Sequence, residues 1–215
     1  MQVHGHRGAR ARRPENTLAA FRYAIGQGAD AVELDVAVTK DNVAVVSHDP
    51  VLKSGTPIRT LTRDELPTEI PTLDQVFDLG RGNTVQFDVE TKIFADQPDL
   101  TPGAAEFTEL LLDSIRRHAL ESRVILLSFD PRTLRAIKKL EISIRRSALF
   151  ETPRDWMQVA RESEATALGP EYRLVTPDRV AEAHAAGLEV IPWTANQPED
   201  WAKLAEAGCD AIISD

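Results

Sequence analysis

The chain alternates short runs rich in valine and isoleucine with helix-patterned segments along its 215 residues. This alternation most limits the fold, because successive strand–helix units build a parallel sheet covered by helices. We predict eight strands, at residues 2–6, 31–36, 85–90, 124–129, 146–150, 165–169, 189–193 and 211–214. We predict seven helical segments between them, at residues 15–28, 72–80, 105–120, 131–140, 153–163, 177–187 and 198–208.

Eight strands separated by seven helices predict an α/β fold of the (β/α)8 TIM-type barrel class. An open, doubly wound sheet would show the same alternation, but no glycine-rich nucleotide fingerprint follows the first strand. We expect the last helix of a complete barrel to be missing or truncated, because the sequence ends at Asp215. No linker or low-complexity tract interrupts the chain, so we expect residues 1–215 to form a single barrel domain.

The composition limits the partners and the compartment. The 34 acidic and 25 basic residues give a formal net charge of −9, which argues against nucleic acid or an anionic membrane as the main partner. A single cysteine, Cys209, excludes an intramolecular disulfide. The sequence has no signal-like start and no apolar run long enough to span a bilayer. We expect a cytoplasmic protein that binds a small molecule without stable membrane association, and the sequence indicates no oligomeric state.

Two predicted strands carry acidic residues where a barrel strand should be apolar on both faces. Glu33 and Asp35 are two residues apart in "VELDV", and Asp88, Glu90 and Lys92 follow the same spacing in "FDVETK", so each set shares a face. Buried carboxylates on neighbouring strands repel one another unless a cation lies among them. Oxygen ligands favour one hard divalent cation, Mg²⁺ or Ca²⁺, over zinc. Exposure to solvent at a strand end would explain acidic residues in one strand, but it is a poorer explanation for acidic residues in two neighbouring strands.

The segment "TKDNVAVVSHD" predicts a small hairpin after the second strand. Asp41 and Asn42 both tolerate left-handed backbone and suit a two-residue turn. A turn centred there places Asp35 opposite His48. We therefore expect the hairpin to return this histidine to the carboxylates.

His6 and Arg7 end the first predicted strand, at the carboxyl edge where barrel enzymes hold their catalytic groups. By the alternation of strand side chains, His4 points to the same face but lies deeper, so we interpret it as structural support. In "PENT", Asn16 and Thr17 are good helix-capping residues, and capping of the next helix is a sufficient explanation for both.

Taken together, these motifs resemble those of the glycerophosphodiester phosphodiesterase family, a family of metal-dependent barrel enzymes. The resemblance rests on six motifs in the family's order, "GHRGARARRPENTLAAF", "GADAVELDVAVTKDNVAVVSHDP", "IPTLDQVF", "FDVETK", "GLEVIPWTAN" and "GCDAIISD". It implies a single catalytic domain that hydrolyses glycerophosphodiesters, small molecules of lipid metabolism, to glycerol phosphate and an alcohol. It also implies eight site residues in three groups, namely His6 and His48 as acid and base, Glu33, Asp35 and Glu90 as metal ligands, and Arg7, Lys92 and Trp193 as substrate contacts.

Two other functions remain open, and three departures from the family's pattern bear on the site. A phospholipase D-like or sphingomyelinase D-like lipid phosphodiesterase would use the same barrel, and a phosphate-ester-binding module without turnover would keep the same residues. Asp88 stands where relatives often have asparagine, and residues 51–69 form a shorter insertion than usual. The family commonly continues past "SD" with a proline and a last helix, which this sequence does not include. The sequence identifies no pocket for the second alcohol, so we expect weak discrimination between alcohols.

Overall fold

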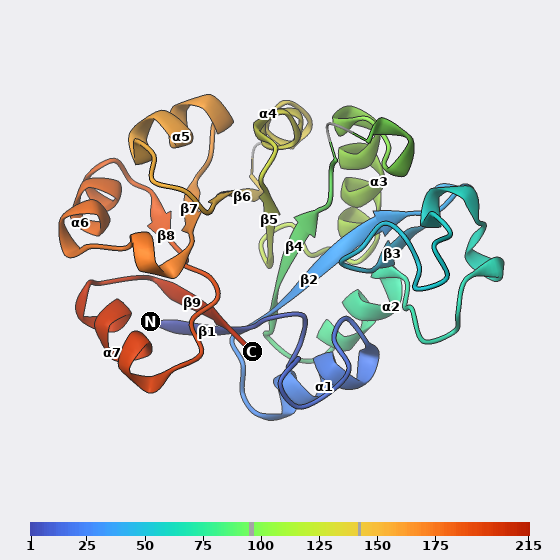
Figure 1. Ribbon diagram of the computed structural model, residues 1–215, viewed down its shortest axis with the longest axis horizontal. Helices are drawn as coiled ribbons and strands as arrows, with labels where there is room; N and C mark the ends of the chain where they lie inside the picture. Colours follow the sequence, from blue (N-terminus) through green and yellow to red (C-terminus); the bar gives the residue numbers. More distant parts are fainter. Residues whose placement is uncertain (95–96, 142) are drawn as a thin grey trace.

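The computed structural model describes residues 1–94, 97–141 and 143–215, and within them eight parallel strands form one sheet (Figure 1). The strands are β1 (Gln2–Gly5), β2 (Ala31–Val38), β4 (Gln86–Thr91), β5 (Val124–Ser128), β6 (Arg145–Phe150), β7 (Ala167–Pro170), β8 (Glu189–Val190) and β9 (Ala211–Ser214). Hydrogen-bonded neighbours follow the order β8-β7-β6-β5-β4-β2-β1-β9. Each predicted strand is present, although β8 is shorter than predicted.

The sheet curls until its two edge strands meet. Beyond the ladder, the backbone N–H of Asp210 donates to the carbonyl of Val190 at 3.1 Å, and that of Ile213 donates to Pro192 at 2.9 Å. These bonds join the β8 segment to β9, which neighbours β1 in the sheet order. The result is a nearly closed barrel, which confirms the predicted barrel over an open sheet.

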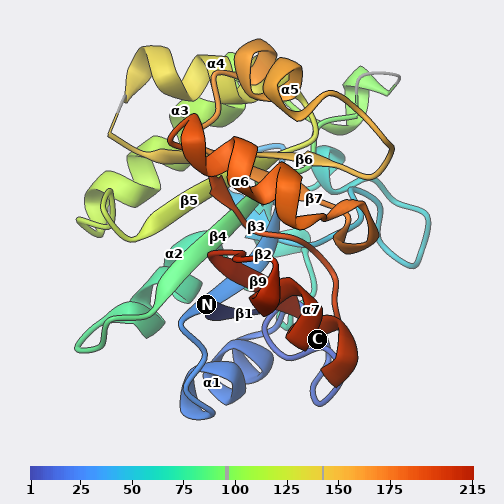
Figure 2. The same ribbon diagram turned by 90° about the vertical axis from the view of Figure 1, so that its left-hand side faces the viewer.

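Within the described part of the chain, seven α-helices surround the barrel (Figures 1 and 2). They are α1 (Leu18–Gly26), α2 (Leu73–Phe77), α3 (Ala104–Arg117), α4 (Pro131–Leu140), α5 (Trp156–Ser163), α6 (Pro177–Ala185) and α7 (Pro198–Glu206). Each lies within or overlaps a predicted helical segment. In the described ranges, no helix combines the length and apolar character that crossing a bilayer would require.

Helix α1 illustrates how local sequence sets an element's bounds. The hydroxyl of Thr17 accepts a hydrogen bond from the backbone N–H of Ala20 at 3.2 Å, which satisfies one free donor at the helix start. The helix ends at Gly26 with Gln27 as its C-cap, and the next residue, Gly28, has a φ of 86°, the left-handed conformation that glycine adopts without steric cost. There the backbone N–H of Ala29 reaches back to the carbonyl of Ala24 at 3.1 Å, as in a Schellman motif.

The barrel interior is polar on one side and apolar on the other. Strands β5, β6, β7 and β9 and the residue after β8 contribute the apolar side, which consists of Ile125, Leu127, Leu149, Ala167, Ile191, Ala211 and Ile213. In β2, all eight residues are buried, and Val32 and Leu34 belong to the core between sheet and helices. Because strand side chains alternate, the acidic residues between them face the interior. The polar side of the interior therefore comes from β1, β2 and β4.

Strand β3 (Ala44–Val46) pairs antiparallel with β2 and forms the predicted hairpin, but the predicted turn is wrong by one residue. Thr39 and Val43 are hydrogen-bonded through their backbones at 3.0 Å, so residues 40–42 form a three-residue turn. The backbone N–H of Ser47 donates to the carbonyl of Asp35 at 2.9 Å, which places Ser47 rather than the next histidine opposite Asp35. His48 follows the end of β3 and still lies at the site.

Candidate functional site

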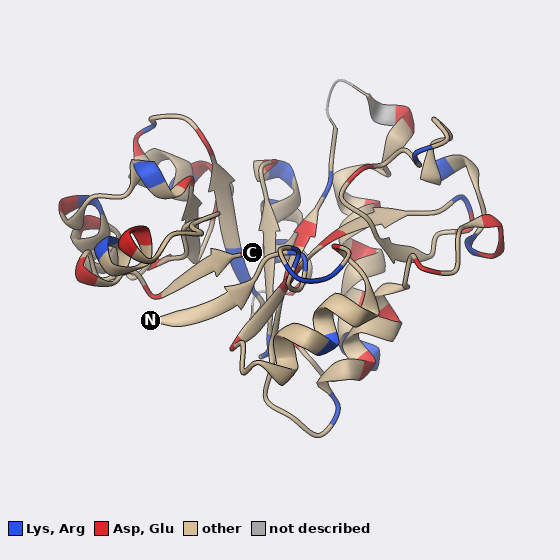
Figure 3. Ribbon diagram, turned by 60° about the horizontal axis from the view of Figure 1, so that its bottom comes forward, with Lys and Arg blue, Asp and Glu red and all other residues tan. Residues whose placement is uncertain are grey.

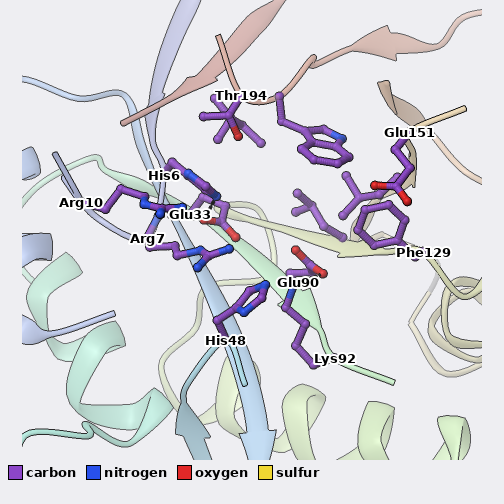
Figure 4. A pocket seen from close by; sticks show the side chains of 14 residues that line it. His6, Arg7, Arg10, Glu33, His48, Glu90, Lys92, Phe129, Glu151 and Thr194 are labelled. Atoms are coloured by element: carbon purple, nitrogen blue, oxygen red, sulfur yellow. Dashed lines mark hydrogen bonds and ion pairs between the residues drawn. The ribbon is translucent and has the colours of Figure 1, made fainter. Parts of the chain in front are cut away.

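A cavity of about 380 Å³ opens at the carboxyl ends of the strands (Figure 4). Its walls contain seven of the eight predicted site residues, namely His6, Arg7, Glu33, His48, Glu90, Lys92 and Trp193. The eighth, Asp35, is buried and touches the basic side chains of this wall. Figure 3 shows the basic segment after β1 close to the acidic positions of the neighbouring strands, near the C-terminus. The fold thus brings the whole predicted set together.

Three buried carboxylates form the polar centre of the cavity. Glu33, Asp35 and Glu90 each offer one oxygen atom, and these atoms all lie within 4.8 Å of one another. The pairing of β2 with β4 produces this cluster, because the ladder sets Asp35 directly beside Glu90. Exposed fractions of 8% or less remove these carboxylates from water. Such a group of hard oxygen ligands suits Mg²⁺ or Ca²⁺.

The cluster is short of positive charge. Burial, followed by repulsion from Asp35 and Glu90, raises the pKa of Glu33 well above its ordinary value. Burial also raises the pKa of Glu90 to about 7, although attraction to Lys92 opposes the rise. Burial acts against ionisation of Asp35 too, but Lys92 and Arg7 outweigh it and lower the pKa of Asp35. A further cation between the carboxylates would relieve the repulsion, so these residues fit a divalent metal ion.

Lys92 and Arg7 bring the positive charge that the cluster has. The Lys92 ammonium lies 2.9 Å from Asp35 Oδ1 and 2.5 Å from Glu90 Oε1, and these carboxylates raise the pKa of Lys92 although burial opposes this. Arg7 places Nε 3.3 Å from Asp35 Oδ2 and donates its backbone N–H to Glu33 Oε2 at 2.8 Å. Its φ of 48° is left-handed, a conformation that non-glycine residues rarely adopt. Both cations therefore line the cavity beside the carboxylates.

His6 is oriented by the last residue of the chain. Its Nδ1 lies 2.6 Å from Asp215 Oδ1, while its Nε2 lies 4.0 Å from Glu33 Oε2. The hydrogen bond from His6 lowers the pKa of Asp215 in spite of its partial burial, so this carboxylate is ionised and can only accept. Nδ1 must therefore carry the proton, which leaves Nε2 available on the side of the cluster. Asn196 fixes Asp215 in turn, through an amide donor 2.8 Å from Asp215 Oδ2.

His48 has a similar arrangement on another wall of the cavity. Its Nδ1 lies 2.7 Å from a carboxylate oxygen of Asp49, and its side chain is 36% exposed. Figure 4 shows both imidazoles, Arg7 and Glu90 around the same space. The arrangement can therefore hold an anion against two cations and offer one imidazole nitrogen from each of two sides.

Asn16 is a site residue that the sequence did not reveal. Its amide donates to Asp35 Oδ2 at 2.8 Å, and its Oδ1 accepts from the backbone N–H of Asp35 at 3.4 Å. The prediction that Asn16 caps the next helix is wrong, because Thr17 alone provides that cap. The sequence did contain a signal for a second role of Asn16. One helix start needs only one N-cap residue, and here two capping residues are consecutive.

Asp88 and His4 form a separate pair deeper in the barrel. Asp88 Oδ2 lies 2.5 Å from His4 Nδ1, and both side chains are fully inaccessible to solvent. Asp88 does not belong to the carboxylate cluster, which is limited to the other three acidic residues of β2 and β4. The pairing of His4 with Asp88 below the site agrees with the structural role predicted for His4.

Phe129 and Trp193 form an aromatic part of the cavity lining. Trp193 donates its indole N–H to the carbonyl of Gly169 at 2.7 Å, and its ring meets that of Phe129 edge to face at 5.5 Å between centroids. Phe129 is 46% exposed, although it is a large apolar residue. Arg10, Glu151 and Thr194 also line the cavity, and none of them was predicted as a site residue.

Known proteins are similar to this chain over nearly its full length. The sequence model of the "Glycerophosphoryl diester phosphodiesterase family" matches residues 6–215. A glycerophosphodiester phosphodiesterase from Caldanaerobacter subterraneus subsp. tengcongensis is 32% identical over 99% of this chain and 93% of its own.

Solved structures are equally similar in fold. A putative glycerophosphoryl diester phosphodiesterase from Silicibacter pomeroyi superimposes with a TM-score of 0.89 at 28% identity, covering 100% of this chain and 89% of its own. A phosphodiesterase from Oleispira antarctica, solved with its product sn-glycerol-3-phosphate, gives a TM-score of 0.89 at 24% identity over 100% and 92% of the two chains.

Proposed function

Because the chain belongs to the glycerophosphoryl diester phosphodiesterase family, we propose that it hydrolyses glycerophosphodiesters to glycerol phosphate and an alcohol with the help of one divalent cation. The observation that carries this proposal is the cluster of three buried carboxylates beside two cations and two imidazoles in one cavity. The activity named for the relative that is 32% identical supports it.

Glu33, Asp35 and Glu90 would hold the cation, in agreement with the raised pKa values of two of them. When bound, Mg²⁺ or Ca²⁺ would add positive charge beside the phosphate and lower the pKa of the attacking hydroxyl or water. Asn16 fixes the orientation of Asp35 through its amide contacts. Hydrogen bonds from neighbouring residues to a metal ligand are common in metalloproteins and fix the orientation of that ligand.

Arg7 and Lys92 would bind the phosphate oxygens. A phosphodiester carries one negative charge and gains more in its five-coordinate transition state, so fixed cations lower the barrier when they are already in place. Lys92 is held as an ammonium by Asp35 and Glu90, and the Arg7 guanidinium is held by Asp35 and Glu15. Neither cation needs to move far to meet a phosphate in the cavity.

His6 and His48 would divide the two proton transfers. One neutral imidazole accepts the proton of the nucleophile at Nε2, and the other, protonated, donates its proton to the departing alkoxide. The two roles require opposite sides of the phosphorus atom, because attack and departure are in line. Asp215 and Asp49 accept from the Nδ1 atoms and so stabilise each imidazolium when it forms. Trp193 would form an apolar wall for the glycerol carbons.

A panel of substrates tests the proposal against its rivals. We expect release of glycerol phosphate from glycerophosphocholine when Mg²⁺ or Ca²⁺ is present, and slower turnover of lysophosphatidylcholine vesicles. Preferred turnover of the vesicles would favour the lipid phosphodiesterase. Tight binding of glycerophosphocholine with no turnover under any metal would favour the binding module and contradict the proposal.

A further inference from the structure

A second cavity of about 360 Å³ adjoins the candidate active site beside β4 and β5. It shares five lining residues with the first cavity, namely His48, Glu90, Lys92, Phe129 and Glu151. A ligand whose phosphate lies against Lys92 can therefore extend into this second space without leaving the site.

Most carboxylates around the second cavity already have partners. Asp130 forms a two-point ion pair with Arg132, whose Nε and Nη2 lie 3.0 Å and 2.5 Å from its oxygens. Asp49 accepts from His48. Glu90 is paired with Lys92 at 2.5 Å. These groups leave little net charge to attract a ligand.

Glu151 differs from these carboxylates. It follows Phe150 at the carboxyl end of β6, is exposed, and forms no ion pair or hydrogen bond within the described residues. Figure 4 shows its carboxylate beside the ring of Phe129, on the side of the cavity away from His6 and Arg7. The junction of the two cavities therefore presents an unneutralised negative charge next to an aromatic ring.

The aromatic residues of this space suit a cation. Phe129 is 46% exposed, and Phe94 lines the same cavity from the segment after β4. Aromatic faces attract cations, and quaternary ammonium groups combine this attraction with an apolar shell that covers the ring. A carboxylate next to such a ring adds a direct charge interaction.

We infer that Phe94, Phe129 and Glu151 form an alcohol subsite, which binds the departing alcohol of a glycerophosphodiester and prefers an alcohol that carries an ammonium group. This inference rests on the proposed function and deepens it by naming a substrate class, esters of choline or ethanolamine. It differs from the expectation of weak discrimination between alcohols. The sequence pattern did not reveal the subsite, because its three residues come from three separate loops.

The test compares two esters that differ by one charge. In glycerophospho-3,3-dimethylbutanol a carbon atom replaces the nitrogen of glycerophosphocholine, so size and shape are matched. We expect kcat/KM for the choline ester to exceed that of its uncharged analogue by roughly five- to thirtyfold, the scale of one exposed ion pair with a cation–π contact. A wild-type ratio below about twofold would overturn the inference.

Two variants assign the preference to the alcohol subsite. Glu151→Gln removes the charge, and Phe129→Leu removes the ring but keeps apolar volume; each should lower the ratio of the two kcat/KM values by roughly three- to fivefold. Glu109→Gln is the matched control, because Glu109 is an exposed residue of α3 and the change in net charge is the same. Equal ratios in the Glu151→Gln and Glu109→Gln proteins would show that Glu151 does not form the subsite.

Binding distinguishes failure of the subsite from failure of the proposed function. Phosphonate analogues of the two esters, with a methylene group in place of the departing oxygen, bind without being hydrolysed. If no ester is turned over but the choline phosphonate binds several-fold more tightly in a Glu151-dependent way, the subsite stands and the catalytic proposal fails. Turnover of both esters with equal affinity for both phosphonates would instead refute the subsite alone.

Discussion

Replacing Glu90 by glutamine should stabilise the metal-free protein at pH 8, even though it deletes an ion pair with Lys92. Glutamine keeps the shape of the side chain and removes the charge. The pKa of Glu90 rises from 4.5 to about 7 on folding, mainly because the carboxylate is buried. The attraction of Lys92 is already contained in that value, so the remaining shift is a net cost of carrying the charge.

The sign and the size follow from the shift. A carboxyl group with a raised folded-state pKa costs nothing below pH 4.5, where it is protonated in both states. The cost grows as pH rises, because the unfolded chain ionises first, and it is complete above about pH 7. The difference in pKa corresponds to about 3 kcal/mol at pH 8. We therefore expect the Glu90→Gln protein to gain up to about 3 kcal/mol at pH 8 and almost nothing near pH 4.5.

Urea denaturation in the presence of a chelator measures this difference directly at the two pH values. Glu109→Gln serves as the control for a lost surface charge. With saturating Mg²⁺ the order should reverse, because only the wild-type protein keeps all three ligands and gains stability from binding. A Glu90→Gln protein that is less stable than wild type at pH 8 without metal would refute the argument that the cluster is short of positive charge.

Three further predictions concern the residues around the cluster. The substitutions His6→Ala and His48→Ala should each lower kcat by roughly 10²–10⁴. A p-nitrophenyl ester, whose leaving group departs without a proton, should restore activity only to the variant that lacks the general acid. Equal rescue of both variants would contradict the division of the two proton transfers between the histidines. Asn16→Ala should weaken metal binding by roughly 10- to 100-fold, measured by calorimetric titration, and unchanged affinity would show that Asp35 needs no such support. The substitution Asp215→Asn should lower kcat with little effect on KM and should shift the pH–rate profile. The reason is that a neutral amide does not hold the proton of His6 at Nδ1 as the carboxylate does. A pH–rate profile identical to that of the wild type would contradict this positioning role of Asp215.

The regular elements were predictable because the sequence encodes them locally. Alternating apolar residues mark each strand, and capping residues such as Thr17 and Gly28 mark the ends of α1. Glu33, Asp35 and Glu90 were recognisable as candidate metal ligands, because barrel strands are normally apolar on both faces and carboxylates on two neighbouring strands therefore stand out. The predicted hairpin brought His48 to the site, although its turn was wrong by one residue.

The remaining site residues depend on contacts that the sequence pattern does not contain. Asn16 looks like a helix cap, and only the folded chain shows its amide against Asp35. Asp88 shares a face with Glu90 but lies outside the carboxylate cluster, because it pairs with His4 deeper in the barrel, and the alternation of strand side chains does not encode that depth. Glu151 lies beyond the end of its strand, where loops have no period from which to infer a direction.

We propose that the three buried carboxylates hold one metal ion and that hydrolysis of a glycerophosphodiester requires this ion. The most direct measurement follows metal binding and turnover of glycerophosphocholine together, in protein that has been stripped of metal and analysed for residual ions. We predict no turnover in the stripped protein, recovery in proportion to one bound Mg²⁺ or Ca²⁺ per chain, and loss of both binding and recovery when Glu33, Asp35 and Glu90 are all changed to alanine. Full turnover in the metal-free protein, or normal ion binding by the triple variant, would contradict the account.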